Sequence, residues 1–326
     1  MRNPNVDIAK GILLILVILG HILQGSFTES LPRYLIYGFH MPLFMTISGY
    51  LFSAHIDKIS TSDWLLKTFK RAVIPWLLAV VVFALYLNYV GYYHLSLQAL
   101  AVESITFPFY HLWFIPAWIS YQCSLRAVEK IKFPPRMMFW ISFLISTVFM
   151  WLQTSGQPWI NLNTIPILKQ VLHVFRPQFF FFFILGYIIK NHPSAIPSAI
   201  VRTLKNPVHS IAAAAIFTGV FFLRNGFPQQ TVLHSTAYAA SFLYLNTTLS
   251  FWSLSKIASN QWPQVPLLNW IGQQSLLIYL WHPMAIMIAK YTISYRPTPQ
   301  FYFSSVTTTI SILVLIYFYE RFRRNA

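Results

Sequence analysis

The stretch DIAKGILLILVILGH, residues Asp7 to His21, decides how this chain folds. It belongs to an apolar segment long enough to span a bilayer as a helix, yet it carries three ionisable side chains. Ionisable groups inside a membrane are costly and usually functional. At about 100° per residue, Lys10 and His21 fall on one helix face, roughly 16 Å apart along the axis. Asp7 lies one turn before Lys10 and can pair with it.

This helix face permits two interpretations. In one, it belongs to an active site in which His21 and Asp7 are catalytic candidates. In the other, Lys10 snorkels to the membrane surface and His21 hydrogen-bonds to a neighbouring helix. The combination of an intramembrane cation and an imidazole on one face favours the active site.

The composition identifies the class of protein. It is 56% hydrophobic and only 9% charged, against roughly 25% charged in soluble domains. Apolar stretches near 20 residues recur, which predicts an all-α polytopic integral membrane protein of about ten transmembrane helices. We expect residues 1–326 to form a single transmembrane domain with no separate soluble domain. The expected spans are about 8–26, 34–53, 71–90, 110–127, 137–153, 171–190, 207–224, 232–254, 267–289 and 301–319.

The net charge of +16 does not indicate nucleic-acid binding. Most lysines and arginines fall in alternate loops, the pattern that membrane insertion leaves behind. The bias predicts that both the N- and C-termini are cytoplasmic. It also fits a bacterial inner membrane, in which the lipid bilayer would surround the chain.

The histidines are expected to gather at similar depths, because successive spans run in opposite directions at about 1.5 Å per residue. His21, His40 and His282 would share a level in the outer half of the membrane. His111 and His173 begin spans near the outer boundary of the same region. We therefore add His40 to His21 as a catalytic candidate.

Acidic residues and metal-ligand spacings are scarce. Asp7 is the one carboxylate expected within a span, which disfavours a transporter driven by protons or sodium ions through intramembrane carboxylates. Imidazoles could bind a transition metal at His21, His40 and His282, but tight ligand spacing is missing. We expect no metal and no bound cofactor.

Two further segments interrupt the apolar pattern. Pro42, in FHMPLFMTISGY (residues 39–50), leaves a backbone carbonyl without its helical donor, and Ser48 with Gly49 permits close helix approach or a local unwinding. A basic run precedes Pro75 and can bind phosphate groups, although a cytoplasmic anchor explains it equally well. This run consists of Lys67, Lys70 and Arg71.

These motifs together resemble the membrane acyltransferase 3 family, and within it the fucose 4-O-acetylase-like branch. A basic residue, ten intervening positions and a histidine match Lys10 and His21, and FHMPLFMTISGY follows. The basic run before Pro75, HLWFIPA from His111 and SLLIYLWHP from Ser275 complete the resemblance in order. The family often has two arginines three apart where this chain has Lys67 and Lys70. We expect the membrane-only form, with no appended esterase-like domain.

The resemblance implies an O-acyltransferase that moves an acyl group, usually acetyl, from cytoplasmic acetyl-CoA as co-substrate. The acceptor would be a hydroxyl of an envelope carbohydrate or a lipid-linked carbohydrate. A neutral imidazole at His21 would take the acceptor proton or be acylated itself. The acyl-donor-binding candidates are Lys10, Lys67, Lys70 and Arg71; the acceptor or oxyanion candidates are Ser48, Tyr50, His111, Trp113, Arg176 and His282.

Two other classes of protein remain possible from the sequence. A transporter or flippase of an acyl group or a lipid-linked glycan would explain the spans and use the basic face for pyrophosphate. It would not explain why an imidazole is aligned with Lys10. A structural partner protein in an assembly would need no buried cations.

Overall fold

A computed structural model describes residues 3–23, 25–26, 29–52, 60–109, 111–155, 172–227, 231–292 and 298–325. These residues are overwhelmingly helical and contain no strand, as expected for an all-α membrane protein. The chain divides into two compact units. Unit 1 contains Met1–Gln24, Ser60–Pro116 and Gln264–Ala326, and unit 2 contains Gly25–Ile59 and Ala117–Pro263.

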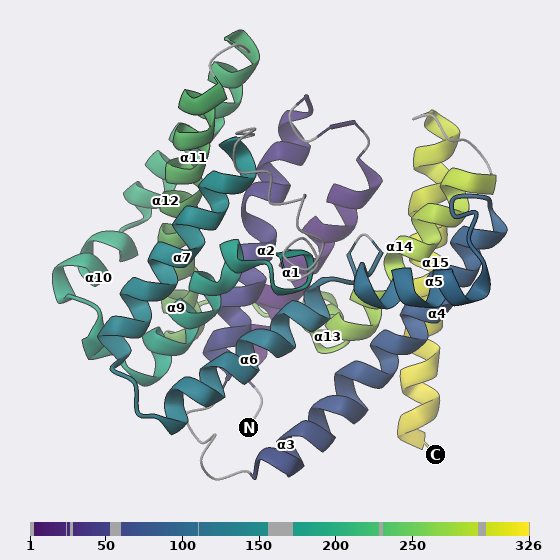
Figure 1. Cartoon of the computed structure of the whole chain (residues 1–326), viewed down its shortest axis with the longest axis horizontal. Coiled ribbons are helices and arrows are strands. Elements are labelled where there is room, and N and C mark those ends of the chain that lie inside the picture. The colour runs from purple at the N-terminus through teal and green to yellow at the C-terminus, as the bar shows by residue number, and fades with distance from the viewer. Residues whose placement is uncertain are drawn as a thin grey trace. The chain divides into compact units, whose positions relative to one another are not determined.

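Unit 1 brings the two ends of the chain together. In it α14 and α15 pack side by side, and the short helix α5 lies crosswise to α4 (Figure 1). A π-helical turn, η2, joins α3 to α4 without a break. Its elements are α1 (Pro4–Ile22), α3 (Thr61–Thr68), η2 (Phe69–Val73), α4 (Ile74–Tyr89), α5 (Leu97–Thr106), α13 (Pro266–Gln273), α14 (Ser275–Thr292) and α15 (Pro299–Asn325).

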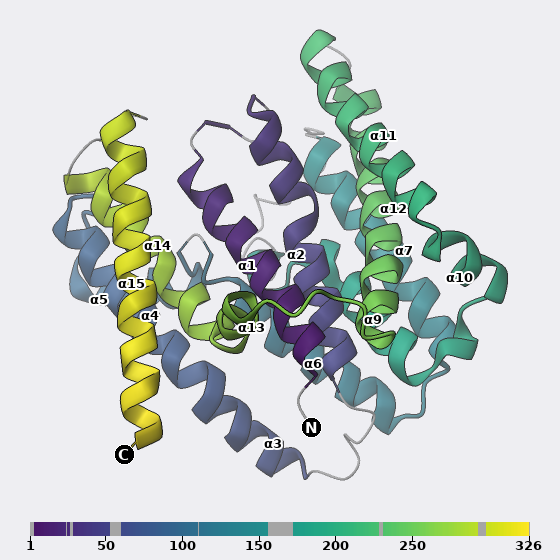
Figure 2. The same cartoon turned by 180° about the vertical axis from the view of Figure 1, so that it is seen from behind.

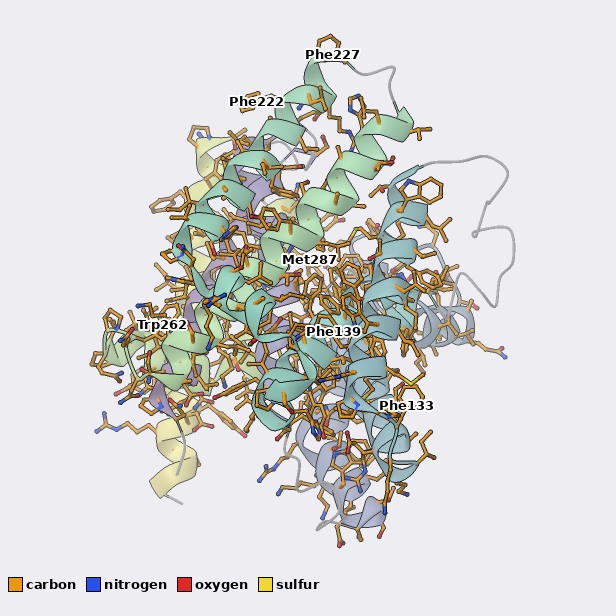
Figure 3. The ribbon with its side chains drawn as sticks, turned by 90° about the vertical axis from the view of Figure 1, so that its left-hand side faces the viewer. Phe133, Phe139, Phe222, Phe227, Trp262 and Met287 are labelled. Atoms are coloured by element: carbon orange, nitrogen blue, oxygen red, sulfur yellow. The ribbon has the colours of Figure 1, made fainter. Side chains whose placement is uncertain are left out.

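Unit 2 contains the middle of the chain. Phe222 and Phe227, each 59% exposed, project outward from the end of α11, whereas Phe139 on α7 is 5% exposed (Figure 3). Exposed phenylalanines suit a lipid-facing surface. The elements are α2 (Leu31–Leu51), α6 (Phe114–Lys130, which begins in unit 1), α7 (Pro135–Ser155), η3 (Pro177–Phe179), α9 (Phe180–Asn191), η4 (Pro193–Ala195), α10 (Ser198–Lys205), α11 (Pro207–Gly226) and α12 (Thr231–Ala258).

Six helices are long and apolar enough to cross a membrane: Pro4–Ile22, Thr61–Tyr89, Pro135–Thr154, Leu172–Asn191, Pro207–Gly226 and Pro299–Phe322. The other four expected spans also contain helices, namely α2, α6, α12 and the pair α13 and α14. The prediction of one continuous span over 267–289 is wrong, because the chain turns at Gln274 between α13 and α14. The count of ten spans and the cytoplasmic termini stay predictions.

A reciprocal pair of glycines joins α1 to α13 in unit 1. Asn3 caps the start of α1, and Pro4 occupies its first turn, where a missing N–H costs nothing. A Cβ on Gly11 would overlap the carbonyl of Leu268, and a Cβ on Gly272 would overlap the carbonyl of Asp7. The two backbones therefore touch without intervening side chains. Figure 2 shows α1 and α13 as neighbours. This contact fixes the position of Asp7.

The same device joins α2 to α9 in unit 2. A Cβ on Gly49 would overlap the carbonyl of Phe183, and a Cβ on Gly186 would overlap that of Thr46. The close approach that Gly49 permits was expected from the sequence, and the structure identifies α9 as the partner. Small residues of this kind are the usual means of close helix packing in membranes.

Pro42 lies inside α2 and deprives the carbonyl of Gly38 of its usual donor. The side-chain amide of Asn246, which is fully buried on α12, donates to that carbonyl at 2.7 Å and also to Phe242 O at 2.8 Å. Asn246, about 200 residues away in sequence, thus replaces the hydrogen-bond donor that Pro42 lacks.

We expect Gly272→Ala to destabilise the protein, because the added methyl must push α13 away from Asp7. Overpacking of this kind typically costs about 1–3 kcal/mol. Gly219→Ala is the matched control, since a Cβ there meets nothing within 4 Å and alanine favours a helix interior by roughly 0.5–1 kcal/mol. Thermal unfolding in detergent should show a lowered midpoint for the first variant alone. Equal midpoints would contradict the packing argument.

We expect Asn246→Leu to destabilise the protein by about 1–3 kcal/mol, because the Gly38 carbonyl loses a donor. In a Pro42→Ala background residue 42 has an N–H again, so the same change should cost much less. A double-mutant cycle of thermal stability measures this coupling. Additive effects would mean that Asn246 does not compensate for Pro42.

Candidate catalytic histidine cluster

Two histidines from opposite ends of the chain form a hydrogen-bonded pair in unit 1. His21 lies in the last turn of α1 and is partly exposed, whereas His282 on α14 is completely buried. Nε2 of His282 lies 2.9 Å from Nδ1 of His21. The ring centroids are 5.0 Å apart and the ring planes differ by 16°, so the hydrogen bond lies close to both ring planes.

His111 packs against both of these rings. Its centroid lies 6.1 Å from that of His21 and 5.9 Å from that of His282. The tyrosine hydroxyl of Tyr279 donates to the His111 carbonyl, and His111 Nε2 lies 3.2 Å from the carbonyl of Leu280. Helix α14 therefore positions His111 as well as His282.

The turn that carries His111 is also held by α4. The indole nitrogen of Trp76 donates to the carbonyl of Leu112 at 2.9 Å. His111 itself is 4% exposed and His282 is 0% exposed. Of the three imidazoles, His21 is the one that a substrate can reach most readily. The expectation that His21 and His282 share a level agrees with their direct contact.

The hydrogen-bonded pair of His21 and His282 can pass a proton between its ring nitrogens. Imidazole can accept a proton at one nitrogen while the other donates a hydrogen bond. Within the described residues, no group of three histidine, cysteine or acidic side chains could hold a metal ion.

The expected ion pair at the start of α1 is present. Nζ of Lys10 lies 2.8 Å from a carboxylate oxygen of Asp7, whose side chain is 3% exposed against 16% for Lys10. Beside them Asn5 is fully buried, and its side-chain oxygen accepts from Gln264 Nε2 at 2.8 Å. The first turns of α1 thus carry a buried polar group whose charges compensate each other.

The three cations of the basic run are exposed. Lys67 lies in the last turn of α3, and Lys70 and Arg71 lie in the π-helical turn η2. Pro75 explains this turn, because it cannot donate to the carbonyl of Arg71, and Ile74 N–H bonds instead to Phe69 O five residues back. Turns of this kind occur frequently at functional sites.

Three candidates lie on α2 in unit 2. His40 is 3% exposed, and its Nδ1 lies 2.5 Å from the carbonyl of Ile36 in the preceding turn. Ser48 and Tyr50 lie near the end of the helix and are partly exposed. Nζ of Lys190 lies 5.1 Å from the centre of the Tyr50 ring, which is a cation–π geometry.

Arg176 also belongs to unit 2 and interrupts the helix that contains it. Its φ of 47° is left-handed, and Pro177 follows. The hydroxyl of Tyr121 donates to the carbonyl of Arg176 at 2.5 Å. The Nε of Arg176 donates to the carbonyl of His173 at 3.1 Å. Non-glycine residues in this conformation need such fixed surroundings and cluster at functional sites.

Aromatic side chains near these candidates pack in the interior. Phe181, Phe182 and Phe183 are all 0% exposed, so these rings form core contacts and do not offer a sugar-binding surface. Trp113 is partly exposed and lies against Phe114, with centroids 6.1 Å apart.

Sequence reasoning missed two buried residues of unit 1. Glu320 is 4% exposed and lies near the end of the candidate span Pro299–Phe322, so the chain buries a second carboxylate that the sequence did not single out. Tyr279 was not singled out, although it holds His111. Its position three residues before His282 in a helical motif was the available signal.

The fold and site together define an all-helical membrane protein with a cluster of three histidines, of which His21 lies in a candidate membrane span. The sequence profile described as acyltransferase domain, of the acyltransferase 3 family, matches residues 3–318. The chain therefore belongs to the acyltransferase 3 family.

Two relatives match over shorter stretches. Nodulation protein NolL of Mesorhizobium japonicum is 43% identical over 83 residues, which are 23% of this chain and 22% of that protein. Nodulation protein NolL of Sinorhizobium fredii is 47% identical over 66 residues, 18% of each chain. The chain thus aligns with about a fifth of each of these relatives. No solved structure matches the chain significantly.

Proposed function

We propose that the protein is a membrane-embedded O-acyltransferase that moves acetyl from cytoplasmic acetyl-CoA to a hydroxyl of an envelope glycan or its lipid-linked precursor. Family membership supports acyl transfer in general. The observation that carries the proposal is the partly exposed His21 ring, hydrogen-bonded through Nδ1 to the buried His282. An imidazole placed in this way can act in proton transfer, in a region expected to lie within the membrane.

The chemistry needs one base and no change of oxidation state. His21 takes the proton of the acceptor hydroxyl as the oxygen attacks the thioester carbonyl. The carbon–sulfur bond breaks, and the CoA sulfur receives the proton that His21 held. A base of this kind contributes about 10²–10⁴-fold to the rate. Acylation of His21 itself would use the same ring and the same partner.

The donor candidates fall in the same unit as His21. Lys67, Lys70 and Arg71 are exposed cations that suit the phosphates of CoA. Lys10 is partly accessible on the face of α1 that leads from its start to His21. We propose that it meets the donor as the pantetheine arm enters.

Binding of the acceptor and stabilisation of the oxyanion require polar groups in fixed positions. We retain Trp113 in unit 1 and His40, Ser48, Tyr50 and Arg176 in unit 2 as candidates for acceptor binding or oxyanion stabilisation. Arg176 is the best placed of these for an anionic group, because its guanidinium is oriented by His173. The basic loops support a bacterial inner membrane as the location.

We expect His21→Ala to abolish acyl transfer, by at least about 10²-fold, while membrane abundance and acetyl-CoA binding persist. Transfer can be measured with isotope-labelled acetyl-CoA and membrane vesicles that supply glycan acceptors. His94→Ala removes an exposed histidine of the same unit and should leave the rate unchanged. Full activity of the His21 variant would remove the catalytic assignment.

We expect Lys10→Met to weaken acetyl-CoA binding by roughly tenfold, which calorimetry on purified protein can measure. Because this change leaves a buried Asp7 carboxylate without its cation, the double variant Asp7→Asn, Lys10→Met is the control. Equally weak binding by both variants supports direct donor contact. Recovery in the double variant would mean that the loss came from Asp7.

A further inference from the structure

His282 is held in one protonation pattern by its own helix. Its Nδ1 lies 2.8 Å from the carbonyl oxygen of Ile278, one turn back on α14. A carbonyl can only accept, so Nδ1 must carry the hydrogen. Pro283 follows directly and has no N–H. It therefore cannot donate to the carbonyl of Tyr279, which lies in the same turn.

The protonation pattern of His282 dictates that of His21. A neutral imidazole has one N–H, so Nε2 of His282 accepts a hydrogen bond. The neighbouring atom, Nδ1 of His21 at 2.9 Å, must then be the donor. The unprotonated nitrogen of His21 is therefore Nε2, the atom on the far side of the ring from His282.

We infer that His282 is a positioning residue for acyl transfer: it fixes the Nδ1–H tautomer and the orientation of His21, so that Nε2 is the reacting nitrogen. This inference rests on the proposed function. A buried partner that selects the tautomer of a catalytic histidine is a general device, usually provided by a carboxylate. Here a second imidazole, 0% exposed, provides it.

The pair also spreads the charge that the reaction creates. When the acceptor proton moves to His21 Nε2, the oxygen attacks the thioester carbon, and His21 becomes an imidazolium. Its Nδ1–H then donates to a neutral imidazole nitrogen, a charge-assisted hydrogen bond that is stronger than the one at rest. The proton leaves Nε2 for the CoA sulfur when the carbon–sulfur bond breaks, and both rings return to their initial state.

Packing holds the pair in this geometry. His111 contacts both rings and is itself tied to α14 through Leu280 and Tyr279. A rotation of the His282 ring would break its bond to Ile278 and the bond to His21 together. The tautomer of His21 is thus set by the backbone of a helix about 260 residues away in sequence.

The decisive variants are His282→Leu and His282→Gln. Leucine removes the acceptor, whereas the glutamine side-chain oxygen can replace Nε2 as the acceptor for His21 Nδ1–H. We expect His282→Leu to lower kcat by about 10²-fold or more with the KM for acetyl-CoA unchanged, and His282→Gln to recover most of that loss. His94→Leu is the matched control. A merely structural role would lower abundance and acetyl-CoA binding instead of kcat.

A second measurement does not depend on turnover. Nitrogen-15 NMR of histidine-labelled protein distinguishes the two tautomers, and the His21 signals are those that His21→Ala removes. We expect Nδ1–H on His21 in the wild-type protein and in His282→Gln, and a shift toward Nε2–H in His282→Leu. An Nε2–H tautomer in the wild-type protein would overturn the inference.

The outcomes separate the two proposals. Transfer that needs His21 but is as fast in His282→Leu as in the wild-type protein overturns the positioning role alone. Absence of acetyl-CoA binding and of transfer in folded wild-type protein overturns the proposed function, and the positioning role with it.

Discussion

Every backbone carbonyl buried in a membrane needs a hydrogen-bond donor from the protein, and a proline inside a helix removes one such donor. Pro42 leaves Gly38 O, which receives the amide of Asn246. Pro75 leaves Arg71 O, and the helix widens into a π turn. Pro283 cannot donate to Tyr279 O, and in the same turn the ring of His282 bonds to Ile278 O.

Candidate functional residues lie beside each of these interruptions. His40 precedes Pro42 by two positions, Arg71 precedes Pro75 by four, and His282 directly precedes Pro283. The left-handed Arg176 likewise precedes Pro177. An interrupted helix frees polar groups and space that a regular helix lacks, which is what a site inside a bilayer needs. The same local irregularity therefore serves both backbone satisfaction and the placement of reactive groups.

Much of unit 1 could be predicted from the sequence because its signals are local. Three-residue spacing predicts the Asp7–Lys10 pair, and it is present. The positions of His21 and His282 along their expected spans predicted the same membrane depth for both, and the two rings are hydrogen-bonded to each other. The choice of helix neighbours was beyond such reasoning, because it depends on backbone contacts such as Gly272 against Asp7 between segments far apart in sequence. The break at Gln274 and the burial of Glu320 could not be predicted either. Hydropathy is averaged over a window of residues, so it does not reveal a single turn or the surroundings of a single side chain.

The chemistry of the histidine pair has an electrical consequence. Both rings are uncharged at rest under the hydrogen-bond pattern described, and the pair Asp7–Lys10 on the same helix is neutral as a whole. A charge that crossed the full membrane would gain or lose about 2.3 kcal/mol per 100 mV. A cycle that takes one proton from an alcohol and gives it to a sulfur within one small cluster carries no such charge. Under the proposed function, acyl transfer by this pair would neither draw on the membrane potential nor be opposed by it, so its rate would be the same in an energised and a de-energised cell.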